Sequence, residues 1–263
     1  MDKIQIQVLE PETVAISEKL MVACARLTQH GHEVTSVEDF MSLYNKPYTQ
    51  STVARLAALP HPTLQKFGMI SLVVVGASRR FLAQITRHQN EVKFMSASLQ
   101  YSNMTGCSRF VVPYEVMSDD ADRCQDYIRA NNNAIRAYEK LIADGADNDT
   151  AGYLMPHSMR NVLVISATAY QWKHMIRQRT CRRNTSETRY VMLRCWEELY
   201  KLSPALFADA GPFCMRGHCE EGAMSCGNAI DRTMTPSEIL RQDFPLLYEH
   251  YDVTSWPGEN TTK

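Results

Sequence analysis

The sequence lacks several features that would assign the protein to a common class. Its longest apolar run, residues 69–75, is far shorter than the roughly 20 residues of a membrane-spanning helix, so no transmembrane segment is expected. Residues 1–7 contain no basic region followed by an apolar run, so they do not resemble a signal peptide. Neither sign of charge is in excess, because 28 basic and 29 acidic residues give a formal net charge of -1.

These absences exclude some partners and locations. A chain without net positive charge has no global attraction to nucleic acid or to an anionic membrane, so neither is expected as a partner and any anion site must be local. Eight cysteines in a chain without a signal peptide are better interpreted as reduced thiols or metal ligands than as a disulfide framework. We therefore expect a cytoplasmic protein.

Two kinds of nucleotide-binding loop are also missing. Neither Gly-x-Gly-x-x-Gly nor Gly-x-x-x-x-Gly-Lys-Ser/Thr occurs in the sequence. This absence argues against a Rossmann cofactor site and against a P-loop. A large cofactor would have to be held in another way.

What is present is typical of a globular protein. The chain has 263 residues, of which 44% are hydrophobic and 22% charged, so it can bury a substantial core. Alternating apolar residues predict a strand at 4–8, and three- and four-residue spacing predicts a helix at 12–27. We expect two helices within 37–58, a strand at 69–75 closed by Gly76, and a helix at 77–88.

The second half of the chain is expected to contain further helices. Residues 110–113 should be extended, and residues 118–120 should cap a long helix. Pro156 is expected to open another helix, and Asn184-x-x-Glu187 resembles a capping box for the next one. The segment Thr235-Pro-Ser-Glu predicts a late helix start, and residues 257–263 should be flexible. The alternation of short strands with long helices favours an α/β or α+β domain rich in helix.

The composition shifts after about residue 203, where cysteines occur among glycines. We therefore expect one domain at residues 1–202 and an appended element at 203–263. Cys214, Cys219 and Cys226, with His218 nearby and Cys181 as a fourth candidate, could bind zinc. Their spacing forms no paired Cys-x-x-Cys motif, so buried reduced thiols are the favoured interpretation and no metal is expected.

Two basic segments indicate a local anion site. Arg80, Gln84, Arg87 and His88 follow the spacing that places side chains on one face of a helix. A second basic segment, residues 172–183, contains five further arginine or lysine side chains and a histidine. Such groups suit a phosphorylated ligand, and we expect the two segments to share one site.

These segments resemble the signature of the flavin-dependent thymidylate synthases, which is Arg-His-Arg followed after seven or eight residues by Ser. Here Arg87-His88-Gln89 is followed after eight residues by Ser98. His174, Arg179 and Glu187 match a second family element, and His61-Pro62-Thr63 is similar to a third. The resemblance covers roughly residues 50–200.

The resemblance implies a fold, a reaction and a quaternary structure. The fold is a helix-rich α/β (α+β) domain around a small mixed or antiparallel sheet. The reaction is methylation of dUMP at C5, with carbon from methylenetetrahydrofolate and a hydride from FAD that NADPH has reduced. The family uses no cysteine nucleophile, and the sequence accordingly has no Pro-Cys-His stretch. Homotetramers share each site between subunits.

The resemblance also implies roles for particular residues. Arg179 would lie beside the pyrimidine and stabilise negative charge that develops on the ring, with Ser98 as a second catalytic residue. The implied cofactor-binding residues are Thr63, Arg87, His88, Gln89 and His174. The implied substrate-binding residues are Gln84, Ser96, Ser98, Leu99, Gln100 and Arg179.

Several positions depart from the family pattern. Gln89 replaces the last Arg of the signature, and Ser96 replaces a Glu. Gln100 and Gly152 each stand where the family has an arginine that contacts phosphate. Thr168 and Tyr170 replace an Asn-x-Arg pair that holds flavin. Two alternatives therefore stay open. The protein could place a methyl or hydroxymethyl group on another pyrimidine nucleotide such as UMP, or it could be an inactive nucleotide-binding homologue.

Overall fold

The computed structural model describes residues 4–107, 110–117 and 121–247. Its centre is a four-stranded sheet of β1 (Gln5–Leu9), β2 (Ile70–Ser78), β3 (Val92–Ser96) and β4 (Arg160–Ala167). The strand order is β1-β2-β4-β3, and all neighbouring strands are antiparallel. The predicted helix-rich fold with a small antiparallel sheet is therefore confirmed, and the strand expected at 4–8 is β1.

Helices make up most of the remaining structure. They are α1 (Glu12–His30), α2 (Val37–Asn45), α3 (Gln50–Ala57), α4 (Arg79–Ile85), α5 (Tyr114–Met117), α6 (Ala121–Ala143), α7 (Asn148–Gly152), α8 (Ala169–Arg179), α9 (Ser186–Leu202), α10 (Pro204–Phe207) and α11 (Pro236–Asp243). Short 3-10 turns are η1 (Gly31–Glu33), η2 (Pro62–Gln65), η3 (Phe213–Arg216) and η4 (Gly222–Met224). None of the helices in the described ranges is long and apolar enough to cross a membrane.

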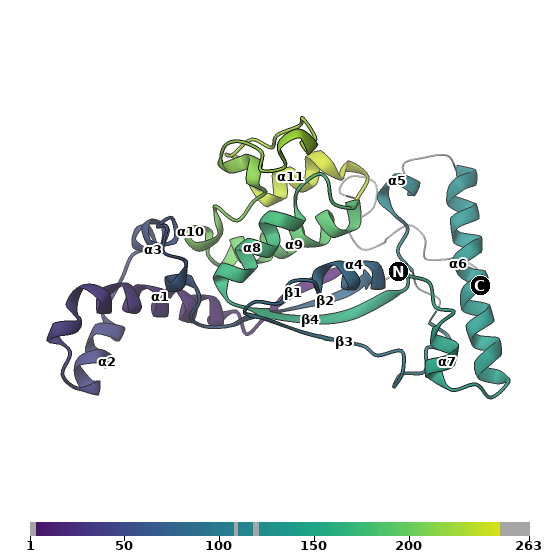
Figure 1. The fold of residues 1–263 in the computed structure, drawn as a ribbon, viewed down its shortest axis with the longest axis horizontal. Helices are drawn as coiled ribbons and strands as arrows, with labels where there is room; N and C mark the ends of the chain where they lie inside the picture. The colour runs from purple at the N-terminus through teal and green to yellow at the C-terminus, as the bar shows by residue number, and fades with distance from the viewer. Residues whose placement is uncertain (1–3, 108–109, 118–120, 248–263) are drawn as a thin grey trace.

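One face of the sheet forms the main core. Ile6, Leu72, Val74, Leu163 and Ile165 alternate along the strands and are buried. Helices α8 and α9 lie over the sheet, with α11 beyond them, while α1–α3 occupy one end and α6 and α7 the other (Figure 1).

Two tryptophans join the helices to this core. The indole N–H of Trp172, on α8, donates to the Ile70 carbonyl over 2.9 Å, and that of Trp196, on α9, donates to the Phe207 carbonyl over 2.9 Å. Both side chains are almost completely buried. Burial of such large apolar groups, with the N–H satisfied, holds α8 and α9 in place.

The opposite face of the sheet is open in the single chain. Met95 is 74% exposed and Val162 is 44% exposed, and the alternating residues Val73, Val75 and Val164 are only partly buried. This surface, which we call the open sheet face, is therefore largely apolar.

Three local predictions were wrong. Gly76 does not end its strand, because β2 continues to Ser78 with an irregular register between Val75 and Ala77 where Gly76 has φ of +90°. The following helix, α4, is consequently shorter than predicted at both ends. Pro156 opens a turn rather than a helix, since the Met159 N–H bonds to its carbonyl and the chain then enters β4.

The predicted capping box at Asn184 was also wrong. Thr185 precedes α9 without a side-chain cap, and Asn184 donates instead to the carbonyls of Gln178 and Cys181. The helix start predicted at Thr235 is confirmed, and there Thr235 and Glu238 form a capping box. The expected caps at 118–120 and the tail at 257–263 lie outside the described residues.

Candidate active site

A cavity of about 420 Å³ lies where α4, the end of α8 and the start of α9 meet, and we call it the arginine cavity. Its lining includes Arg80, Gln84, Arg87, His157, Arg179 and Arg183. No acidic side chain is among the described residues that line it. Four guanidinium groups around one space form a strong site for phosphate or another anion.

Arg179 is the last residue of α8 and is held by two contacts. Its Nε–H donates to His88 Nε2 over 2.9 Å, and its Nη2 donates to the Gln84 carbonyl over 3.0 Å. Burial and the neighbouring Arg87 lower the pKa of Arg179, but an arginine keeps its charge at neutral pH. The guanidinium is thus a fixed cation at the cavity, and no residue in the described ranges accepts from its remaining N–H groups, which can therefore face a ligand.

His88 is the partner that orients this arginine. It is 7% exposed, and burial, Arg179 and His174 together lower its pKa to about 4. Because Arg179 can only donate, the neutral imidazole accepts at Nε2 and carries its proton on Nδ1. The rings of His174 and His88 pack in a T-shaped arrangement, with centroids 5.7 Å apart and an angle of 84° between their planes.

Gln84 and Glu187 connect α4 to α9. The Gln84 side-chain carbonyl accepts from the Thr188 hydroxyl over 2.6 Å, which leaves its NH₂ group to donate elsewhere. The buried Glu187 carboxylate accepts from the Ser78 N–H over 2.6 Å and from the Ser78 hydroxyl over 2.5 Å. Burial raises the pKa of Glu187, whereas the hydrogen bonds from Ser78 act to lower it. The two contacts fix the helix that carries Gln84 against the start of α9.

A second cavity of about 560 Å³ is lined in part by His174, whose ring contacts His88, the residue that holds Arg179. It is lined by η2 residues Pro62 and Gln65 and by Tyr170, Lys173 and His174 of α8. Lys173 donates to Gln65 over 2.9 Å and forms an ion pair of 2.5 Å with Asp209. Burial lowers the pKa of Lys173, whereas Asp209 raises it.

The structure therefore brings together five of the predicted residues: Gln84, Arg87, His88, His174 and Arg179. Thr63 is exposed on η2, whose neighbouring residues line the second cavity. Gln89 is exposed in the turn beyond His88.

Residues 96–100 are not among those that line the arginine cavity of the same chain. The Ser98 hydroxyl accepts from the backbone N–H groups of Gln100 and Tyr101, and so it organises a turn after β3. Leu99 packs instead against a small core that includes Tyr138 and Met155. Ser96, Ser98 and Gln100 therefore do not meet Arg179 within one chain.

Two departures from the family pattern have structural explanations. A Cβ at Gly152 would lie 3.3 Å from the Cβ of Leu99, so a larger residue there requires a shift of Leu99. Thr168 caps α8 by accepting from the Gln171 N–H and donates to Glu91 over 3.0 Å. In this chain, Gly152 thus allows close packing against Leu99, and Thr168 caps α8.

Arg80, whose spacing from Gln84 was the signal that placed it on the expected basic helix face, lines the arginine cavity. Sequence reasoning did not assign two further residues that the structure places at or beside this cavity: His157 lines it, and Thr188 holds Gln84. Unlike Arg80, these two residues had no signal in the sequence, because only the tertiary fold brings them to α4.

Comparison with known proteins agrees with this geometry. Residues 12–205 match the family described as thymidylate synthase complementing protein. A flavin-dependent thymidylate synthase from Geobacter sulfurreducens is 26% identical over 178 residues, covering 67% of this chain and 76% of the relative. Another from Clostridium tetani is 24% identical over 230 residues, covering 81% and 90%.

Solved structures share the fold at low identity. A UMP/dUMP methylase from Streptomyces cacaoi bound with 5-Br dUMP aligns with a TM-score of 0.61 and 16% identity, over 80% of this chain and 95% of that one. Thymidylate synthase X from Helicobacter pylori, with FAD and dUMP, aligns with a TM-score of 0.58 and 14% identity, over 79% and 98%.

Proposed function

Because the chain belongs to the thymidylate synthase complementing protein family, we propose that it is an FAD-dependent thymidylate synthase that methylates dUMP at C5. One observation carries this proposal: Arg179 is held by neutral His88 and by α4 at a cavity surrounded by three more arginines. This arrangement suits an anionic nucleotide whose ring gains negative charge during reaction.

The described residues fit a flavin dinucleotide. The arginine cavity offers cations for phosphates, and the second cavity offers the aromatic ring of Tyr170 and the polar side chains of His174 and Lys173. Arg87, His88, His174, Thr63 and Gln89 would hold this cofactor. FAD, when bound, supplies the hydride, with NADPH as the reductant and methylenetetrahydrofolate as the carbon donor.

Each residue at the arginine cavity then has a definite task. Arg179 uses two contacts for its own orientation and directs its other N–H groups to the pyrimidine, where a fixed positive charge stabilises the electron-rich ring. Gln84 donates its NH₂ group to a ring carbonyl. Arg80 and Arg183 compensate for the phosphate-binding arginines that Gln100 and Gly152 replace.

We further propose a homotetramer with shared sites. Ser96, Ser98, Leu99 and Gln100 would reach the nucleotide from a neighbouring subunit, since they lie away from Arg179 in their own chain. The open sheet face supplies an apolar surface for this association. Residues 203–263 would be an appended element, and the eight free thiols fit a reducing cytoplasm.

The second candidate is methyl or hydroxymethyl transfer to another pyrimidine nucleotide such as UMP. The observation that favours it is the contact between Leu99 and Gly152, because an arginine at position 152 would require Leu99 to shift, and its absence implies a rebuilt nucleotide site.

Product analysis tests these proposals together. Purified protein is incubated with FAD, NADPH, methylenetetrahydrofolate and equal amounts of dUMP and UMP, and the nucleotides are identified by mass spectrometry. We expect dTMP from the wild type and from Arg129→Ala, an exposed control. Arg179→Ala should lower kcat by about 10²- to 10³-fold. A ribonucleotide or hydroxymethyl product would favour the second candidate, and absence of both FAD binding and product would indicate an inactive homologue.

A further inference from the structure

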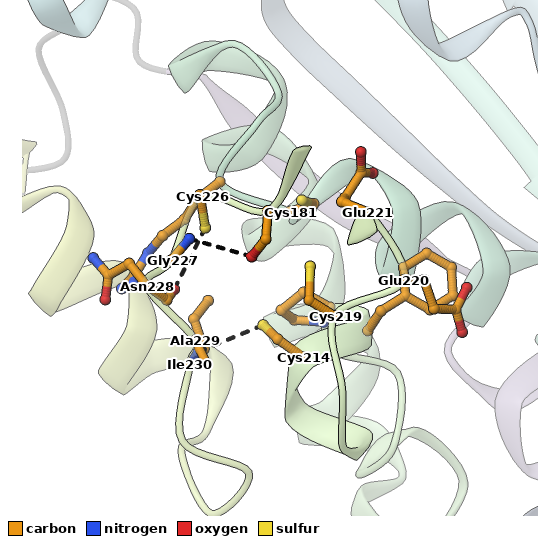
Figure 2. A pocket seen from close by; sticks show the side chains of 14 residues that line it. Cys181, Cys214, Cys219, Glu220, Glu221, Cys226, Gly227, Asn228, Ala229 and Ile230 are labelled. Carbon is orange, nitrogen blue, oxygen red and sulfur yellow. Dashed lines mark hydrogen bonds between the residues drawn. The ribbon is translucent and has the colours of Figure 1, made fainter. Parts of the chain in front are cut away.

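Four of the eight cysteines surround one small cavity outside the proposed active site. Cys181 lies in the turn after α8, Cys214 lies in η3, and Cys219 and Cys226 lie in the loop that follows. The cavity has a volume of about 200 Å³. Figure 2 shows these four side chains around the cavity. Half of the thiols in a 263-residue chain are thus gathered from three separate segments.

The loop between η3 and α11 has almost no core of its own. From residue 216 to residue 229, Cys219 is the one described residue that is not exposed. The guanidinium groups of Arg182 and Arg183 bind the carbonyls of Asn228 and Met224 and so tie the loop to the turn after α8. A loop without buried apolar groups needs another link, such as a metal ion, to hold one conformation.

The surroundings of the thiols suit thiolate ligands. The Ile230 N–H donates to Cys214 Sγ over 3.5 Å, and Arg182 lies close to Cys214 and Cys226. A neighbouring guanidinium group and a backbone N–H donor of this kind favour deprotonated sulfur.

We propose that Cys181, Cys214, Cys219 and Cys226 bind one zinc ion as a structural tetrahedral site. Four thiolates are a common ligand set for structural zinc, whereas a disulfide would use only two of the four sulfurs. Each thiol releases its proton to water as the Zn–S bond forms, and Arg182, which lines the same cavity, offsets part of the net negative charge of the product.

Binding requires the sulfurs to move together. No three His, Cys, Asp or Glu side chains within the described ranges are already close enough to hold a metal ion. The loop can supply this movement, because Gly217, Gly222 and Gly227 have open space around them. The ion would then fasten the turn that contains Cys181, two residues after Arg179, to the appended element.

Metal analysis tests this site directly and independently of turnover. The full chain is purified under reducing conditions without chelator, and zinc is measured by inductively coupled plasma mass spectrometry. We expect about one zinc per chain. Cys214→Ser and Cys219→Ser should each lose most of it, whereas Cys24→Ser and Cys124→Ser, at partly buried cysteines elsewhere, should retain it.

A second measurement remains informative if the serine variants do not fold. Zinc in the wild type is exchanged for cobalt, whose absorption reports tetrahedral geometry and thiolate ligation. We expect thiolate-to-cobalt charge-transfer bands together with intense tetrahedral d–d bands. The proposal is overturned if the reduced chain binds neither ion, if cobalt gives an octahedral spectrum, or if mass spectrometry finds disulfides among the four cysteines in protein prepared under reducing conditions.

Discussion

At the scale of single residues, His88 makes stability depend on pH. Its pKa is about 4 in the folded protein, lowered from 6.5 by burial and by Arg179 and His174. Below pH 6.5 the unfolded chain binds a proton at this position that the folded protein does not accept until about pH 4. Stability should therefore fall as pH falls through this range, by roughly 1–2 kcal/mol between pH 7 and pH 5.

Urea unfolding at several pH values measures this effect. The matched variant is His88→Gln, whose side-chain carbonyl can still accept from Arg179 but whose amide does not titrate in this range. The variant should lose less stability than the wild type between pH 7 and pH 5. If both proteins lose the same amount, His88 is not the group responsible.

At the scale of elements, Asp243 anchors α11 to the rest of the fold. Its carboxylate is 8% exposed and accepts from Arg182 over 2.8 Å and also from Arg189. Asp243→Asn keeps the size and shape of the side chain but removes the negative charge that pairs with both arginines. We expect a loss of about 2–4 kcal/mol in the free energy of unfolding, because two poorly hydrated cations lose their partner.

A variant at the other end of the same helix provides the comparison. Thr235→Ala removes the capping box of α11 and should cost only about 1 kcal/mol. Hydrogen exchange should show faster exchange across α11 in Asp243→Asn than in Thr235→Ala. Equal effects of the two substitutions would mean that the ion pairs add nothing beyond helix formation.

Elements whose signals are local could be predicted from the sequence. Residues 12–27 have helical periodicity over four turns, and Thr235 and Glu238 make a capping box that needs no distant partner. Glu187 was placed in a local cap for the same reason, but its carboxylate bonds to Ser78, 109 residues away, because the tertiary contact is available. β4 was missed because Pro156 resembles a helix start and because its pairing with β2 is entirely non-local.

The candidate site likewise has some features that follow from local sequence and others that depend on the tertiary fold. The expectation that the two basic segments lie together agrees with the structure, in which Gln84 and Arg87 line the same cavity as Arg179. The sequence could not show that His157 also lines the arginine cavity or that Ser98 is not among its lining residues. These placements depend on the positions of β4 and of the turn after β3.

At the scale of the whole molecule, two features of the single chain are ones that the proposed shared assembly would explain. The open sheet face leaves Met95 and Val162 in solvent, which is costly for apolar groups. The predicted nucleotide residues around Ser98 are also not among the residues at the arginine cavity. A symmetric assembly could bury the open sheet face and also bring Ser98 of one subunit to Arg179 of its neighbour, which would account for both features.

Mixing two inactive variants tests this shared site. Ser98→Ala and Arg179→Ala, each expected to be nearly inactive alone, are coexpressed so that mixed oligomers form, and dTMP formation is measured per chain. If each site combines Ser98 of one subunit with Arg179 of another, random assembly makes about a quarter of the sites fully wild type, and activity returns to that fraction. If both residues came from the same chain, every site would carry one defect and mixing would restore nothing. Coexpression of Arg179→Ala with Gln84→Ala serves as the control, because these two residues share one cavity in one chain and their mixture should stay inactive.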